Sequence, residues 1–160
     1  MKTHEDFMRI ALKEAEKAAK IDEVPIGCVI VKDGEVISKA HNMKEHQQLS
    51  TSHAEILAIQ KASRKLNTWN LKDCDLYVTL EPCMMCTGSI ILSRMHAVYY
   101  GTNDPKGGCI NTLIDINQIK KINHHPNIYS GILKEECSEI LSSFFRKKRM
   151  QKKDVKNTTI

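Results

Sequence analysis

Two cysteines three residues apart, Cys83 and Cys86, are the first residues whose type and spacing suggest chemistry. Pro82 precedes them and favours a helix start, so both sulfurs are expected on one face of a first helical turn. In that turn the helix dipole and the free backbone N–H groups favour thiolates. Two thiolates alone do not complete a zinc site, because zinc prefers four ligands. By itself the pair is equally compatible with redox chemistry.

A second motif, HAE at residues 53–55, could complete the set. His53 can offer an imidazole nitrogen, and together with the two cysteines it makes three protein ligands. Glu55 lies two positions further on, about 200° around a helix, so it is not expected to bind the same ion. A carboxylate near a metal but not on it could carry protons. Three ligands leave a fourth position open, which is typical of a catalytic zinc site.

Plainer interpretations of the same residues remain open. A histidine at a helix start can be a cap or a surface residue, and a glutamate in a first turn complements the helix dipole. A structural zinc site would need a fourth protein ligand, for which the candidates are His41, Cys74, His96 and Cys109.

The elements that must position these residues alternate between helices and short strands. Asp33-Gly34 predicts a two-residue hairpin turn between two strands, and Thr51 or Ser52 is expected to cap the helix that carries Glu55. Helices are expected over residues 4–20, from 51 or 52 onward, over 82–94 and over 133–150, and strands over 26–32, 35–40, 76–80, 97–101 and 127–130. This pattern predicts an α/β fold with a mixed sheet covered by helices.

The length of 160 residues suits a single domain, and the hydrophobic fraction of 41% is ordinary for a globular chain. The net charge of +5 is unevenly placed, because residues 146–156 hold seven Lys or Arg against one Asp and leave the rest of the chain at −1. Such a run is either a solvated tail or a positively charged segment that binds phosphates. The residues from about 151 are expected to be frayed or disordered.

The remaining composition favours a cytoplasmic protein. No apolar stretch approaches the roughly 20 residues of a membrane helix. The first twenty positions contain several acidic residues, which targeting peptides avoid. The six cysteines are therefore not expected to form disulfides. Cys28 and Cys137 are expected to be packed thiols.

HAE and EPCMMC, at residues 53–55 and 81–86, resemble the signature of the zinc-dependent cytidine deaminase superfamily. Within it the chain most resembles the bacterial tRNA-specific adenosine deaminases, on the stretches EVPIGCVIV (23–31), HN (41–42), TLEPCMMC (79–86), DPKGG (104–108) and LKEECSEILSSFFRKKR (133–149). The resemblance implies a cytidine deaminase-like, three-layer α/β fold with a five-stranded mixed sheet between helices. Residues 1–150 would form the catalytic domain and residues 151–160 a basic, disordered tail.

The resemblance also implies a function and a set of site residues. One Zn²⁺ per subunit would be held by His53, Cys83 and Cys86, and Glu55 would relay protons while adenosine is hydrolysed to inosine at the wobble position of a tRNA anticodon loop. A homodimer whose active site draws on the neighbouring subunit is implied as well. The implied substrate contacts are Val24, Ile26, Asn42, the backbone N–H of Ala54, Asp104, Lys106, Phe145 and Arg149.

Two other functions use the same motifs. A zinc-dependent deaminase of a free base or nucleotide, of the guanine or cytosine type, would have no use for a basic C-terminal helix. A non-catalytic zinc module that binds RNA would have no use for Glu55.

Overall fold

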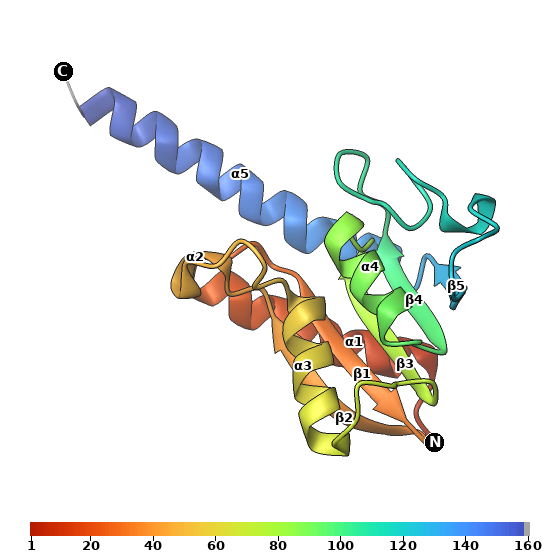
Figure 1. Cartoon of the computed structure of the whole chain (residues 1–160). Helices are drawn as coiled ribbons and strands as arrows, with labels where there is room; N and C mark the ends of the chain where they lie inside the picture. Colours follow the sequence, from red (N-terminus) through yellow and green to blue (C-terminus); the bar gives the residue numbers. More distant parts are fainter. Residues whose placement is uncertain (159–160) are drawn as a thin grey trace.

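A five-stranded sheet in the order β2-β1-β3-β4-β5 organises the computed structural model, which describes residues 1–158 (Figure 1). The strands are β1 (Gly27–Lys32), β2 (Glu35–His41), β3 (Cys74–Leu80), β4 (Ala97–Thr102) and β5 (Asn127–Ser130). The helices are α1 (His4–Lys20), α2 (Lys44–Gln47), α3 (Ala54–Leu66), α4 (Met84–Leu92) and α5 (Lys134–Thr158), with a 3-10 turn at Ile116–Gln118.

The sheet is mixed, as expected. β1 runs antiparallel to both β2 and β3, whereas β3, β4 and β5 run parallel to one another. The β1–β2 connection is the predicted hairpin: Asp33 and Gly34 both have positive φ, 51° and 76°, as a type I′ turn requires. Its twist matches that of the strands it joins, which fixes their register.

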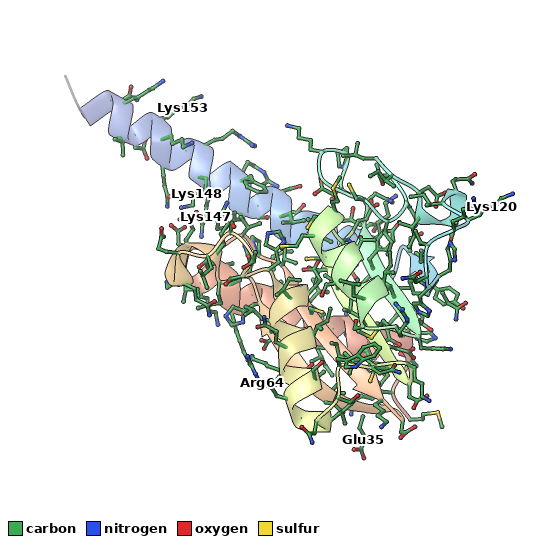
Figure 2. All side chains as sticks on the ribbon, viewed as in Figure 1. Glu35, Arg64, Lys120, Lys147, Lys148 and Lys153 are labelled. Atoms are coloured by element: carbon green, nitrogen blue, oxygen red, sulfur yellow. The ribbon has the colours of Figure 1, made fainter. Side chains whose placement is uncertain are left out.

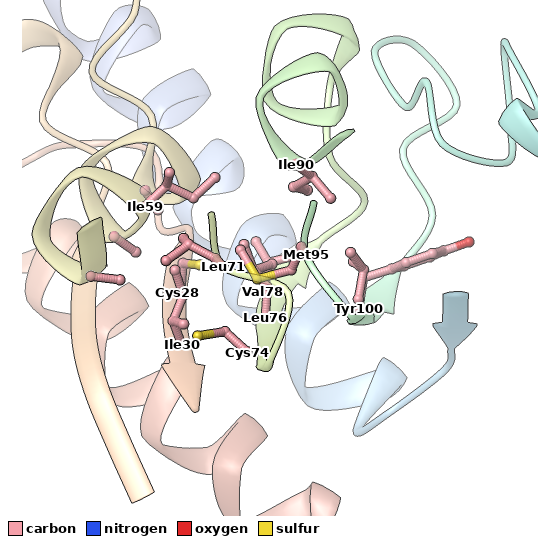
Figure 3. Packing of buried hydrophobic residues seen from close by; sticks show 14 of the residues in the cluster. Cys28, Ile30, Ile59, Leu71, Cys74, Leu76, Val78, Ile90, Met95 and Tyr100 are labelled. Carbon is pink, nitrogen blue, oxygen red and sulfur yellow. The ribbon is translucent and has the colours of Figure 1, made fainter. Parts of the chain in front are cut away.

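Helices cover both faces of this sheet. On one face α3 and α4 pack on Cys28, Ile30, Leu76 and Val78, and Figure 3 shows these side chains interleaved with Ile59 and Ile90. On the other face α1 and the start of α5 cover a second cluster that includes Val29, Val31, Tyr77 and Tyr99. Alternate residues of β1, β3 and β4 supply the two clusters. The predicted three-layer α/β fold is therefore confirmed.

α1 shows how local sequence sets an element. Thr3 is its N-cap, and the Thr3 and Asp6 side chains accept hydrogen bonds from each other's backbone N–H groups, a capping box. Its apolar positions recur at three- and four-residue steps, and Met8 and Ala11 are fully buried. Full burial of a side chain such as Met8 stabilises the fold by about 1.5–3 kcal/mol.

The C-terminal helix is longer than expected. α5 continues to Thr158, so the expectation of a disordered segment from residue 151 is wrong for the part that the structure describes; residues 159 and 160 lie outside it. Residues 151–156 contain neither Gly nor Pro, and Gln and Lys are good helix formers. The first half of α5 packs on β4 and β3, and its second half projects past the sheet (Figure 1).

None of the helices formed within residues 1–158 is both long enough and apolar enough to cross a membrane.

Candidate active site

Three side chains converge where α3 and α4 begin. His53 immediately precedes α3, Cys83 immediately precedes α4, and Cys86 lies in the first turn of α4. Their ligand atoms lie within 4.8 Å of one another, and the sulfurs of Cys83 and Cys86 are 3.6 and 3.5 Å from His53 Nδ1. A tetrahedron with zinc–sulfur and zinc–nitrogen bonds of ordinary length has N–S edges of about 3.6 Å. Both the donor types and their separations therefore fit zinc.

The backbone explains why these side chains face each other. His53 and Cys83 are the N-cap residues of their helices, with extended backbone (ψ 152° and 178°), and neither side chain caps its helix. The prediction that Thr51 or Ser52 caps α3 is therefore wrong. The Ser52 hydroxyl instead lies 2.6 Å from Gln47 Oε1, to which it donates a hydrogen bond. Because neither side chain makes a cap hydrogen bond, both N-cap residues are available to a shared ion.

The thiols are electrostatically prepared for a metal. A hydrogen bond with Cys86 and the nearby His53 ring lower the pKa of Cys83 to about 4. The pKa of Cys86 is raised in turn, by its hydrogen bond with Cys83 and by burial. Without metal the pair therefore keeps a thiolate on Cys83 and a proton on Cys86, and metal binding must release that proton.

Glu55 lies beside this cluster without belonging to it. It is in the first turn of α3, is 4% exposed, and is not among the three clustered ligands. Burial raises the pKa of its carboxyl group to about 7, and the neighbouring Cys83 thiolate acts in the same direction. A carboxyl group with a pKa near neutrality can both accept and return a proton at physiological pH.

The candidates for a fourth protein ligand lie elsewhere. Among residues 1–158 the cluster contains His53, Cys83 and Cys86 and none of His41, Cys74, His96 or Cys109. The His41 ring is 3.1 Å from the Glu14 carboxylate, and the His96 ring is 2.8 Å from that of Asp75. This geometry favours an open fourth position over a structural zinc site.

Asn42 has an atom that lacks a partner. The residue follows β2, is 6% exposed, and donates its backbone N–H to Ile26 O at 3.2 Å. Its side-chain Oδ1 is buried and, within the described part of the chain, has no hydrogen-bond partner. An unsatisfied buried acceptor costs about 1–3 kcal/mol. A ligand that donates a hydrogen bond there would recover that free energy.

A groove of about 840 Å³ lies between the segment before β1, the loop after β4 and the inner side of α5. Six of the predicted contact residues line it: Val24, Ile26, Asp104, Lys106, Phe145 and Arg149. Phe145 is 43% exposed, so it is available at the groove surface. The cations Arg146, Lys148 and Lys152 line the groove as well, and Figure 2 shows Lys147, Lys148 and Lys153 distributed along the same helix. The part these residues play in binding stays a prediction.

Ala54, the remaining predicted contact, is fully buried as the first residue of α3. Its backbone N–H belongs to the helix turn whose amides have no acceptor within the helix.

Two groups with a clear place in the site were missed by sequence reasoning. Lys148 Nζ is 2.5 Å from the Asp22 carboxylate, so an ion pair links α5 to the segment before β1. Glu81 is a buried carboxylate that accepts hydrogen bonds from the loop after β4. Neither contact has a local signal, because the partners are 126 and about 30 residues apart in sequence.

Comparisons with known proteins agree with this geometry. Residues 2–149 match the model of the MafB19-like deaminase family. The chain is 50% identical over 153 residues to the tRNA-specific adenosine deaminase of Bacillus subtilis (strain 168), an alignment that covers 96% of this chain and 95% of the relative. A structure solved in a study of A-to-I editing by tRNA:A34 deaminases superposes with a TM-score of 0.82 at 44% identity, covering 84% of this chain and 98% of that one. A guanine deaminase from Nitrosomonas europaea shares the fold, with a TM-score of 0.79 at 20% identity over 90% of this chain and 85% of that one.

Proposed function

Because this chain belongs to the MafB19-like deaminase family and to the tRNA-specific adenosine deaminases, we propose that it hydrolyses adenosine to inosine at the wobble position of a tRNA anticodon loop. The observation that carries this proposal is the meeting of His53, Cys83 and Cys86 with the buried, non-ligating Glu55. Three metal ligands and one free acid are what hydrolytic deamination by zinc requires.

We propose one Zn²⁺ per subunit, held by His53 Nδ1 and the two sulfurs. When bound, zinc lowers the pKa of a coordinated water to about 7 and so supplies hydroxide at neutral pH. Glu55 would accept one proton of the attacking water and deliver it to N1 of adenine as the water oxygen bonds to C6. It would then accept the remaining hydroxyl proton and pass it to the amino group, so that the C6–N bond breaks and ammonia leaves. Its burial and its raised pKa suit it to both transfers.

The adenine must be held beside that carboxyl group. Asn42 Oδ1 is a buried acceptor without a partner, so it can receive a hydrogen bond from the base. The backbone N–H of Ala54, at the start of α3, can donate one. Val24 and Ile26 provide apolar walls where the groove approaches Asn42, whose backbone N–H is bonded to Ile26 O.

The groove supports a tRNA substrate over a free base, because it offers cations for the phosphates that flank the reactive base. A base inside a duplex is out of reach, so the adenosine must be turned out of a loop while its flanking phosphates stay outside the pocket. Lys106, on the loop after β4, and Arg149, on α5, line the groove from two different segments of the chain. A free base would need neither. The 20% identity to the guanine deaminase supports only a shared fold.

The test is incubation of the purified protein with total bacterial tRNA, followed by sequencing for adenosine-to-inosine conversion. Conversion confined to a wobble position supports the proposal, whereas deamination of free guanine or cytosine with none in tRNA would overturn it. A chain that ends at residue 145 should lose tRNA deamination, while a deaminase of free bases would keep its activity.

We further propose that the protein is a homodimer and acts in the cytoplasm, where its proposed substrate is found. α4 is apolar on its outer side as well as its inner side, and Met84 and Leu92, two turns apart, are 65% and 69% exposed. A second copy covering this face would remove that apolar surface from water. Sedimentation analysis of the wild type and of Leu92→Lys tests the dimer. The wild type should sediment as a dimer and the variant should shift toward monomer, whereas a monomeric wild type would contradict the proposal.

A further inference from the structure

Glu81 is a buried carboxylate that has no part in the chemistry proposed above. It follows β3 and lies two residues before Cys83, and it is 2% exposed. None of the ion pairs found within residues 1–158 involves it. A buried carboxylate without a cation is costly unless several hydrogen bonds satisfy its oxygens.

Those hydrogen bonds all come from one segment, residues 103–112, which we call the 103–112 loop. Four backbone N–H groups donate to the Glu81 oxygens, and so do one side-chain amide and one hydroxyl. They are the N–H groups of Asp104 (3.2 Å), Ile110 (3.3 Å), Asn111 (2.9 Å) and Thr112 (2.9 Å), Nδ2 of Asn103 (3.2 Å) and Oγ1 of Thr112 (2.5 Å). Both ends of the loop are therefore bound to a single carboxylate, by the charge-assisted bonds that are the strong ones in proteins.

The loop also fits closely around Glu81. A Cβ atom on Gly108 would lie 2.4 Å from the Glu81 carboxylate, so this position leaves no room for a side chain. The backbone N–H of Cys109 donates to Pro82 O at 2.9 Å. The loop is thus wrapped around the residues that lead directly into Cys83.

The same loop carries one wall of the groove. Asn103, Asp104 and Lys106 line it from the loop side, facing the side lined by Phe145 and Arg149 of α5. Asp104 itself shapes the loop, since its Oδ1 accepts a hydrogen bond from the N–H of Lys106 at 3.1 Å. Where these groups point depends on the path of the loop, and that path is fixed by Glu81.

We propose that Glu81 is a positioning residue for substrate binding: it holds the 103–112 loop so that Asp104 and Lys106 face the nucleotides that flank the reactive adenosine. This inference rests on the proposed function. It assigns Glu81 to recognition of the RNA and leaves proton transfer to Glu55.

Glu81→Gln tests the proposal with little change of volume. A glutamine has one acceptor oxygen in place of two, and its amide N–H₂ would meet backbone donors, so half of the bonds to the loop are lost. We expect KM for an anticodon stem-loop to rise by about tenfold or more with kcat changed by less than about threefold, the pattern of lost binding. Zinc content should stay at that of the wild type. Amide hydrogen exchange should accelerate in residues 103–112 and little elsewhere.

One further variant acts on the same contact from the loop side, and another serves as a control for lost stability. Thr112→Val removes the hydroxyl donor and keeps the backbone donors to Glu81. It should raise KM in the same way, and it provides the test if Glu81→Gln fails to fold. Val31→Ala is the matched control for lost stability, because Val31 is buried on the opposite face of the sheet, against α1. It should lower the melting temperature and leave KM and loop exchange unchanged.

The outcomes separate this inference from the proposed function. Unchanged KM and unchanged exchange of residues 103–112 in Glu81→Gln would overturn it. A fall in kcat with loss of zinc would overturn it too, since Glu81 would then support the metal ligands and not the loop. If the wild type fails to deaminate tRNA, the proposed function is wrong, and the exchange measurement still decides whether Glu81 orders the loop.

Discussion

Arg149 offers a quantitative test of whether the groove binds RNA. It lines the groove from α5 together with Lys152, and Lys106 lies across from them on the 103–112 loop. The neighbouring cations have protein partners: Lys148 with Asp22 and Arg146 with Glu139. We therefore count three cations for phosphate contacts, and Arg149→Ala leaves two.

The number of phosphate contacts sets the salt dependence of binding. Each contact contributes about −0.7 to −0.9 to the slope of log K against log[salt]. For three contacts the slope is about −2.1 to −2.7, so affinity should fall about 20- to 40-fold between 50 and 200 mM salt. For Arg149→Ala it should fall only about 7- to 12-fold over the same range.

The assay is fluorescence anisotropy of a labelled anticodon stem-loop at several salt concentrations. Arg149→Lys keeps the charge and should keep the wild-type slope. Lys120→Ala removes an exposed lysine from the far side of the molecule (Figure 2) and should also leave the slope unchanged. If Arg149→Ala shows the wild-type slope, or if Lys120→Ala lowers the slope equally, the groove is not the phosphate-binding surface.

Three other substitutions test the active site and the scaffold. Glu55→Gln should lower kcat by about 10²–10⁴-fold, because the proton carrier is lost, while zinc content and melting temperature are retained. Full turnover would instead favour the alternative of a non-catalytic zinc module that binds RNA. Cys83→Ala should lose zinc and lower the melting temperature, measured by metal analysis and calorimetry, whereas Cys74→Ala, a buried thiol outside the cluster, should keep its zinc. Glu23 is buried and accepts three hydrogen bonds from His46 and Glu45, which outweigh the opposing effect of burial and hold its pKa below the ordinary value. Its contribution to stability is complete above about pH 4.3 and is lost as the pH falls through the lowered value. The difference in unfolding free energy between wild type and Glu23→Gln should therefore shrink as the pH falls below about 4.3; a constant difference would contradict this.

Local signals predicted most of the scaffold. The five strands lie within two residues of their expected bounds because each is a short apolar run between turn residues, and Asp33-Gly34 marks its hairpin directly. The ligands were predictable for a chemical reason, since a Cys pair and a His have few other uses in that combination. Their positions at the helix starts were harder to predict. His53 and Cys83 are the N-cap residues, whereas the sequence predicts Thr51 or Ser52 as the cap of one helix and Pro82 as the start of the other.

The features that could not be predicted depend on contacts between distant segments. Glu81 reads as an ordinary polar residue after a strand, and its burial follows only from the return of the 103–112 loop. The extent of α5 beyond residue 151 depends on helix propensity, whereas the expectation of disorder rested on the general tendency of chain ends to fray.

The two ends of the chain differ in what can be attached to them. The N-terminus and the far end of α5 lie at opposite ends of the molecule in Figure 1. An affinity tag, dye or surface linker joined ahead of Thr3 would sit away from the groove, whereas one joined after Thr158 would prolong the helix that forms one of its walls. For immobilisation or for building fusion proteins, the amino end is therefore the handle to use.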